Sequence, residues 1–246
     1  MLISAMVGID SRATMDIDTT LRNYPLNCES AEQLVRQIAD VEIDDKISFV
    51  IKKTEEIMED SEYQGVRLSL DAYLDKTRIP LKIDISTGDV ITPCEISFSY
   101  QLMFENRTIP LLAYPPETVL AEKLETILSR GAANTRLRDF YDVYILQRED
   151  FVVTPDALRY ALLATCRKRG HEDLLHTYAS ILNEVRQSGA MRAQWVKYQT
   201  DFDYAAGITW DTVLDTVETL CMKTLDDHAF GDELPQEESQ FEMHLL

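Results

Sequence analysis

The chain has 246 residues, which is enough for one large domain or two small ones. Its formal net charge of −19 repels a nucleic-acid backbone, so it argues against broad non-specific DNA or RNA binding and favours a small metal-chelated substrate or a positively charged protein partner. The apolar start is too short for a signal peptide and no apolar run reaches the ~20 residues that cross a bilayer, so we expect a soluble cytoplasmic protein without membrane contact.

The cysteine and histidine positions argue against a zinc site. The four cysteines lie far apart and form no C-x-x-C pair, so we expect reduced, mostly buried thiols. The four histidines are scattered over predicted helices and the tail, which makes histidine base catalysis an unfavoured hypothesis. The cysteines are Cys28, Cys94, Cys166 and Cys221.

The first part of the chain alternates between helical and extended patterns. Residues 1–8 are apolar and predict the end of a helix that stops near Gly8, a common C-cap residue. An extended segment follows at about 14–21, and then a turn rich in proline, asparagine and cysteine. Ser30 is the predicted N-cap of the next helix, whose apolar side chains recur at helical spacing at Leu34, Val35 and Ile38.

From Lys46 onward the pattern is rich in strands. Strict alternation of apolar and polar residues at 64–72 and 81–86 is typical of half-buried strands, and 47–58 also predicts a strand. The segments 95–104 and 107–112 predict a hairpin that turns at Glu105-Asn106. This order of elements favours a mixed sheet with helices packed against it.

At 114–117 the pattern changes to helical period and stays helical. Thr154 followed by Pro155 is a strong start signal, because threonine caps a helix and proline suits its first position. The tail from 226 is acidic and polar, which predicts disorder, with a partner-binding segment as the alternative. The predicted division is 1–113, 114–225 and 226–246, and the predicted helices are 118–130, 138–147, 156–169, 172–187, 190–205 and 210–225.

Two aspartates in the extended segment are the first candidate site. Residues two apart on a strand point to the same side, roughly 7 Å apart, so Asp16 and Asp18 could share a divalent ion. Mg²⁺ sites often take one or two protein carboxylates and fill the other positions with substrate phosphates. The alternative is a chance D-x-D pattern on a polar strand face or in a turn.

A third carboxylate, Asp84, lies between Ile83 and Ile85 and faces away from them. If its strand neighbours the D-x-D strand, Asp84 completes a triad that binds a second metal or deprotonates an attacking hydroxyl. The alternative is an edge-strand aspartate that faces water.

A cationic helix face is the second candidate site. Lys123 and Arg130 lie two turns apart on one face with Thr126 between them, which suits a triphosphate, and the alternative is an ordinary solvated face. Asp139 and Asp142 share a face of the next helix. There Arg138 can pair with Asp142, beside the aromatic side chains of Phe140, Tyr141 and Tyr144, which could serve the core or a base. The alternative here is a salt-bridge network between helices.

The four motifs together resemble a known family. The chain contains no P-loop, no Rossmann fingerprint and no G-x-S-x-G. It does contain, in order and within 1–146, Thr14-Met-Asp-Ile-Asp18, Lys82-Ile-Asp-Ile-Ser-Thr-Gly-Asp89, Ala121-Glu-Lys-Leu124 and Arg138-Asp-Phe-Tyr-Asp142. This set resembles the AbiEii/AbiGii toxins, bacterial nucleotidyltransferase-like proteins of abortive infection, toxin–antitoxin systems and phage defence.

The resemblance implies an α+β fold: a polymerase β-like nucleotidyltransferase core with a mixed sheet, followed by a helical C-terminal domain. It implies Mg²⁺ or Mn²⁺ at Asp16, Asp18 and Asp84, and an NTP, GTP or CTP, as the substrate. It further implies an acceptor such as tRNA and a cognate antitoxin protein. By motif position Lys123 would bind the phosphates, with Asp139 or Asp142 as a further essential acid. The remaining nucleotide-binding candidates are Thr126, Arg130 and Arg138.

One departure from the family pattern leaves alternatives open. The fold normally places a Gly-Gly or Gly-Ser pair before the D-x-D strand, and that pair would fall immediately before Met1, so we expect either an upstream start or a damaged phosphate-binding segment. The first hypothesis is a metal-dependent nucleotidyltransferase toxin. The second is a remnant that binds nucleotide or antitoxin without turnover, and the third is a metal-dependent phosphohydrolase.

Overall fold

A computed structural model describes residues 2–8, 16–43, 46–57, 65–102, 105–148 and 153–226. The chain divides into two compact units, Met1–Val90 with Ser97–Leu111, and Ile91–Ile96 with Leu112–Leu246. The expected disordered tail lies outside the described residues from 227 on, as do Thr14 and Met15 of the first motif.

The first unit combines two helices with two sheets. The strands predicted at 47–58, 64–72 and 81–86, the last two from alternation, appear close to their expected positions, and the predicted hairpin forms a separate two-stranded sheet. The elements in chain order are α1 (Leu2–Val7), β1 (Asp16–Leu21), α2 (Cys28–Ala39), β2 (Ile47–Ile57), β3 (Gly65–Leu74), β4 (Thr77–Thr87), β5 (Ile96–Gln101) and β6 (Thr108–Ala113).

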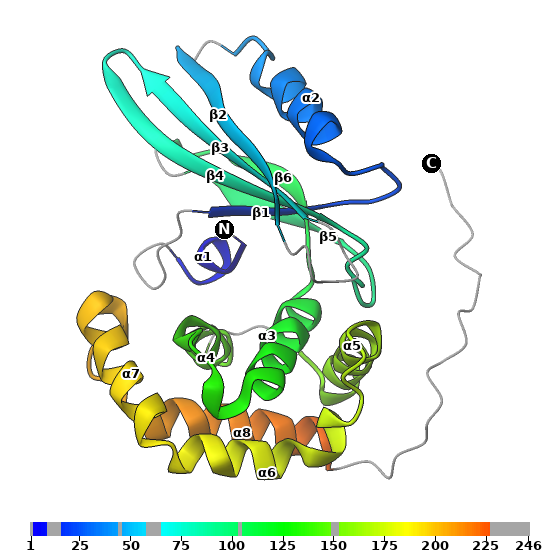
Figure 1. Cartoon of the computed structure of the whole chain (residues 1–246), viewed down its shortest axis with the longest axis vertical. Coiled ribbons are helices and arrows are strands. Elements are labelled where there is room, and N and C mark those ends of the chain that lie inside the picture. The colour runs from blue at the N-terminus through cyan, green and yellow to red at the C-terminus, as the bar shows by residue number, and fades with distance from the viewer. Residues whose placement is uncertain are drawn as a thin grey trace. The chain divides into compact units, whose positions relative to one another are not determined.

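The larger sheet has the strand order β1-β4-β3-β2 (Figure 1). β1 runs parallel to β4, whereas β3 is antiparallel to both β4 and β2, so the predicted mixed sheet is confirmed. The parallel register pairs Asp18 with Asp84, and the antiparallel register pairs Asp84 with Arg67. The first motif and the second motif therefore lie side by side.

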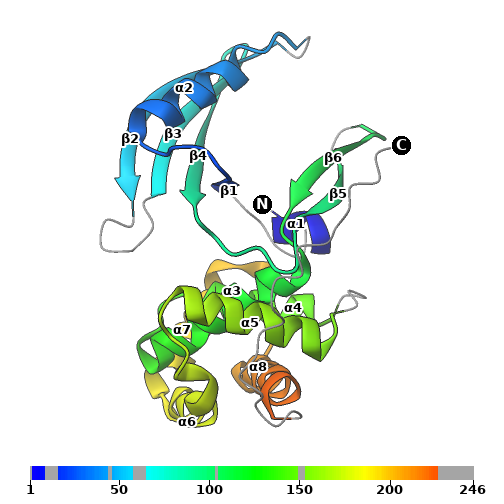
Figure 2. The ribbon, with the colours of Figure 1, turned by 90° about the vertical axis from the view of Figure 1, so that its right-hand side faces the viewer.

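α2 covers one face of this sheet (Figure 2). Its buried Ala31 and Val35 belong to the same core as Val66, Leu68 and Leu70 of β3. Because successive strand residues point to opposite faces, the alternating positions of β3 and β4, including Arg67 and Asp84, project from the other face. Because the apolar residues of β3 and β4 pack under α2 on one face of the sheet, the polar residues between them lie on the opposite face.

The sequence prediction for α2 needs two corrections. Asn27, not Ser30, is the N-cap; its side chain accepts from the Ser30 backbone N–H at 2.9 Å, and the Ser30 hydroxyl accepts from the Asn27 N–H at 3.0 Å. Ser30 is therefore the third residue of a reciprocal capping box. Ile38, part of the predicted apolar spacing, is 64 % exposed in the last turn of the helix, whereas Val35 is buried.

The second unit is helical. Proline occupies the first turn of both α3 and α5, where its missing N–H costs no hydrogen bond, and Thr154 caps α5 as predicted. The predicted helix 190–205 is too long: α7 ends at Asp201 because Phe202 is extended, and a short 3₁₀ turn follows. The helices are α3 (Pro116–Arg130), α4 (Leu137–Leu146), α5 (Pro155–Lys168), α6 (Leu174–Gln187), α7 (Gly189–Asp201) and α8 (Trp210–Leu225).

An aromatic core holds these helices together. Phe140 of α4 packs on Trp210 of α8 with ring centroids 5.0 Å apart, and Trp195 of α7 contacts the same Trp210 at 5.8 Å. Phe140 and Tyr141 are buried, so the aromatic side chains of the fourth motif serve the core.

The cysteine prediction is right in part. All four thiols are free; Cys166 and Cys221 are buried, whereas Cys94 is exposed. Within the described ranges, every helix is too short or too polar to span a membrane.

Candidate active site

The first group of candidate residues is the polar row on the sheet face away from α2. Asp18 on β1 and Asp84 on β4 are Cα partners in the parallel register, and neighbouring strands lie about 4.8 Å apart. Asp18 is exposed and Asp84 is half-buried. Two carboxylates on adjacent strands provide the hard oxygen ligands that Mg²⁺ uses, with water and phosphate oxygens completing its coordination. We call Asp18 and Asp84 the carboxylate row.

Arg67 of β3 extends this row. Its Nε donates to Oδ1 of Asp84 at 2.7 Å and its Nη2 donates to Oδ2 at 2.6 Å, so the guanidinium binds both carboxylate oxygens. Planar two-point pairing of this kind fixes the orientation of a carboxylate as well as its charge. The sequence analysis missed Arg67, although its place between Val66 and Leu68 in an alternating strand already puts it on the polar face.

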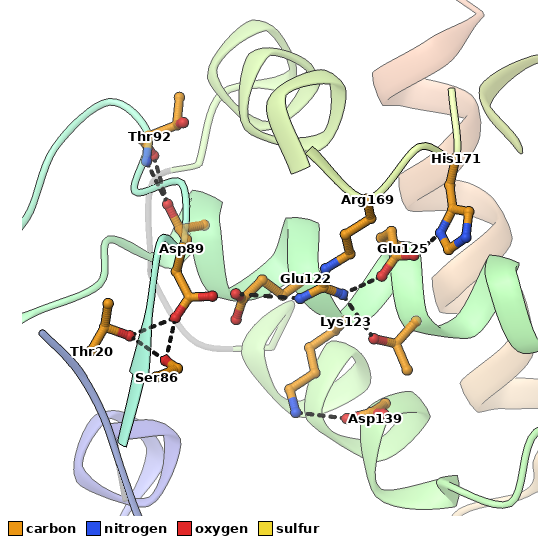
Figure 3. Close-up of polar contacts among 12 residues, drawn as sticks. Thr20, Ser86, Asp89, Thr92, Glu122, Lys123, Glu125, Asp139, Arg169 and His171 are labelled. Carbon is orange, nitrogen blue, oxygen red and sulfur yellow. Dashed lines mark hydrogen bonds and ion pairs between the residues drawn. The ribbon is translucent and has the colours of Figure 1, made fainter. Parts of the chain in front are cut away.

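A second polar cluster lies one step further along the same two strands (Figure 3). Oδ2 of Asp89 accepts from the hydroxyls of Thr20 and Ser86, at 2.6 Å each. Thr20 and Ser86 are themselves register partners, two residues beyond Asp18 and Asp84. Asp89 therefore ties together the ends of the strands that carry the carboxylate row. Asp89 is the last residue of the second motif, and the sequence predicted no role for it.

The remaining predicted metal ligand is at the start of β1. Asp16 is the first residue of β1 and the register partner of Lys82, but its side chain lies outside the described residues. Among the side chains that are described, no group of three or more His, Cys, Asp or Glu lies close enough to hold a metal ion. The row as described thus offers two carboxylates, a number that fits a Mg²⁺ site completed by substrate phosphates.

The second group of candidate residues surrounds Lys123 on α3. Its Nζ lies 2.6 Å from Oδ1 of Asp139 and 3.2 Å from Oδ2 of Asp142, both on α4 (Figure 3 shows the first contact). The lysine side chain is 17 % exposed and the two carboxylates are buried. The structure therefore brings the third and fourth motifs together in a buried ion cluster that joins two helices.

Arg136 completes this ion cluster from the turn before α4. Its Nε lies 2.8 Å from Oδ2 of Asp139 and its Nη2 donates to Oδ1 at 3.2 Å, while its own side chain is 51 % exposed. Two cations thus share one buried carboxylate, and the guanidinium carries the positive charge outward. Arg136 was also missed as a site residue, because its spacing from Asp139 is that of an ordinary helical ion pair.

The remaining predicted nucleotide contacts do not share the surroundings of Lys123. Thr126 is buried, and its hydroxyl accepts from Arg169 at 3.5 Å, so it faces the end of α5. Arg130 is exposed at the last position of α3. The Arg138 guanidinium lies 5.4 Å from the ring centroid of Phe202, a cation–π contact.

The far side of α3 carries an unexpected buried acid. Glu125 binds Nδ1 of His171 at 2.6 Å through Oε1 and forms an ion pair with Arg169 through Oε2 (Figure 3). Leu120, Leu124, Ile127 and Leu128 are buried, so α3 is enclosed by both apolar and ionic packing. This network holds the helix that bears Lys123.

The chain was compared with families and structures of known proteins. A family profile described as "Nucleotidyl transferase AbiEii toxin, Type IV TA system" matches residues 1–216. A search of curated proteins found no match. The chain is also similar to a crystal structure of a provisionally assigned nucleotidyltransferase from H. pylori, with 12% sequence identity and a TM-score of 0.44 over 94% of this chain and 88% of that one.

Proposed function

The chain belongs to the AbiEii nucleotidyl transferase toxin family of type IV toxin–antitoxin systems, and from this membership we propose that it transfers a nucleotidyl group, with a divalent ion, from an NTP to an acceptor such as tRNA. Membership implies an NTP substrate and a cognate antitoxin. We further propose GTP or CTP as the nucleotide, Mg²⁺ or Mn²⁺ as the ion, and phage defence in the cytoplasm as the setting.

The observation that carries this proposal is the register pairing of Asp18 with Asp84. In nucleotidyl transfer a hydroxyl oxygen of the acceptor bonds to the α-phosphorus, the bond from that phosphorus to the bridging oxygen breaks, and pyrophosphate leaves. Asp18 and Asp84, with Asp16 as the third proposed ligand, would hold the divalent ion, which supplies positive charge to the phosphate oxygens when bound. Asp84 is our candidate to accept the hydroxyl proton.

The proposed role of the α3–α4 ion cluster is to bind phosphate. Lys123 and the more exposed Arg136 supply positive charge in a chain whose net charge is −19, and Asp139 fixes the position of both. Asp142 offsets the remaining charge of Lys123 at 3.2 Å. Arg130 and Arg138 stay candidates for contacts to the nucleotide, whereas burial of Thr126 argues for a structural role.

Transfer of label from [α-³²P]NTP to total tRNA tests the proposal. We expect label from one NTP only, dependence on Mg²⁺ or Mn²⁺, and a loss of at least about 100-fold in Asp18→Asn and Asp84→Asn, the scale on which a positioned proton acceptor acts. Asp75→Asn is the matched control: Asp75 lies in the exposed β3–β4 turn at φ +53°, a conformation that asparagine tolerates well. In cells, Asp16→Ala and Lys123→Ala should both relieve growth arrest.

The same assay separates the alternatives. Nucleotide binding in calorimetry without label on any RNA or protein would favour the non-catalytic remnant. Release of free phosphate without transferred label would favour a phosphohydrolase. Full transfer by both Asn variants would contradict the proposed site.

A further inference from the structure

Arg67 lies in a row of charged residues that crosses the whole larger sheet. Asp18 on β1, Asp84 on β4, Arg67 on β3 and Glu55 on β2 are successive register partners. The guanidinium therefore has a carboxylate on each side, Asp84 and Glu55. It makes a two-point contact with Asp84, at 2.7 and 2.6 Å.

Glu55, on the β2 side, pairs with a cation from its own strand, Lys53. The lysine Nζ donates to Oε2 of Glu55 at 2.5 Å. The two-point contact with Asp84 places the charge of Arg67 beside the carboxylate row. This charge is permanent, because a guanidinium does not lose its proton at any working pH.

The two-point contact has opposite consequences for two possible ligands. It places a positive charge beside the row, and this charge opposes the binding of a free divalent cation. A metal–NTP complex carries a net negative charge, so the same guanidinium attracts it. The contact also keeps the carboxylate plane of Asp84 in one orientation.

We propose that Arg67 is a positioning residue that holds Asp84 in place and makes the carboxylate row select the metal–nucleotide complex over the free metal ion. This inference rests on the proposed function, since it assumes that Asp18 and Asp84 hold the metal. In this arrangement the divalent ion arrives with the nucleotide, and Arg67 offsets part of the negative charge that the complex brings.

The test measures binding, with Mn²⁺ detected by electron paramagnetic resonance on the full chain. The probes are Mn²⁺ alone and Mn²⁺ with the non-transferable analogues α,β-methylene-GTP and α,β-methylene-CTP. Arg67→Gln should bind free Mn²⁺ three- to tenfold more tightly and the better Mn²⁺–analogue complex three- to tenfold more weakly. Arg67→Lys keeps the charge without the two-point contact, so its free Mn²⁺ affinity should stay within twofold of the parent while transfer of label falls.

Arg78→Gln is the matched control. Arg78 is on the same strand as Asp84 and pairs with Asp71 at 3.7 Å, but it lies six positions away, about 20 Å along β4 and beyond the screening length of about 10 Å. Both Mn²⁺ affinities should stay within twofold in this variant.

The outcomes separate the two proposals. If Arg67→Gln leaves both affinities unchanged, or shifts them in the same direction, while Asp84→Asn loses Mn²⁺ binding, the role of Arg67 is wrong and the metal site stands. If Asp84→Asn and Asp18→Asn bind Mn²⁺ like the parent, the metal site itself is wrong. Circular dichroism checks that each variant is folded. If Arg67→Gln is unfolded, Arg67→Lys provides the test, and the proposal is wrong if its affinity for free Mn²⁺ differs more than twofold from that of the parent.

Discussion

The ammonium group of Lys123 lies 2.6 Å from Oδ1 of the buried Asp139 and 3.2 Å from Oδ2 of the buried Asp142. A buried carboxylate that loses one of its cations keeps its desolvation cost with less to offset it, and Asp139 would then depend on the half-exposed Arg136. Loss of Lys123 therefore has two consequences, one for the stability of the α3–α4 pair and one for the proposed phosphate contact.

Lys123→Met should lower the free energy of unfolding by at most about 3–5 kcal/mol, the usual cost of breaking a buried ion pair from one side, because Arg136 still pairs with Asp139. Urea unfolding at pH 7.5 measures this. Lys197→Met, on the exposed face of α7, is the control and should change stability by less than about 0.5 kcal/mol.

A double variant then separates folding from function. Lys123→Met with Asp139→Asn removes both charges of the shorter pair, so it should recover part of the lost stability. Transfer of label should remain absent. Recovered transfer in the folded double variant would show that Lys123 only stabilises the fold.

Gly65 at the start of β3 should resist substitution. A Cβ at this position would lie 2.9 Å from Cγ1 of Ile57 on the neighbouring strand, which is closer than ordinary contact. Gly65→Ala should therefore destabilise the protein by about 1–3 kcal/mol, the range for overpacking. Gly189→Ala, where nothing lies within 4 Å of the added atom, is the control and should be neutral or slightly stabilising in thermal unfolding.

The cysteines should differ in reactivity. Cys94 is exposed, whereas burial raises the pKa of the Cys166 and Cys221 thiols to about 12, so these two lack thiolate at neutral pH. Iodoacetamide at pH 8 should modify Cys94 within minutes and leave Cys166 and Cys221 unmodified until urea is added. Peptide mass spectrometry identifies the sites, and rapid labelling of Cys221 in the folded protein would contradict its burial.

Stability should fall in alkali for the same reason. From about pH 9, the ordinary thiol value, the unfolded chain loses thiol protons that the folded chain keeps up to a pKa of about 12. The folded state then binds more protons than the unfolded state, so the free energy of unfolding decreases as pH rises through this window. Urea midpoints at pH 8 and pH 10.5 measure the decrease, and it should be smaller in Cys221→Ala. An equal decrease in that variant would assign the effect to other groups.

Local patterns in the sequence were sufficient for most elements. The predicted helix 210–225 coincides with α8, because Thr209 caps it and its apolar stripe is continuous. Alternation found β3 and β4, where one face is buried and the other is not. Errors arose where local signals compete: the polar pair Asn27 and Ser30 cap each other, and Phe202 leaves the helix to pack on the ring of Tyr198 at 4.7 Å.

Long-range pairing was beyond the sequence. The pattern around Asp84 gave its face but not its neighbour, so its place beside Asp18 stayed conditional until the register was known. Arg67 shows the same limit, since alternation predicts its face whereas its two-point contact needs the β3–β4 register. The contact of Lys123 with Asp139 likewise depends on how two helices pack, which no single motif encodes.

The parallel pairing of β1 with β4 has a consequence for the order in which the protein assembles. Thr20 and Ser86, which face each other across this pair, are 66 residues apart in the chain. Closing so long a loop costs more conformational entropy than closing the short β3–β4 hairpin. The hairpin should therefore form first, and β1 should join last. On the ribosome, a chain interrupted before β4 emerges would have no partner for Asp18, so the carboxylate row would be absent from a partly synthesised chain.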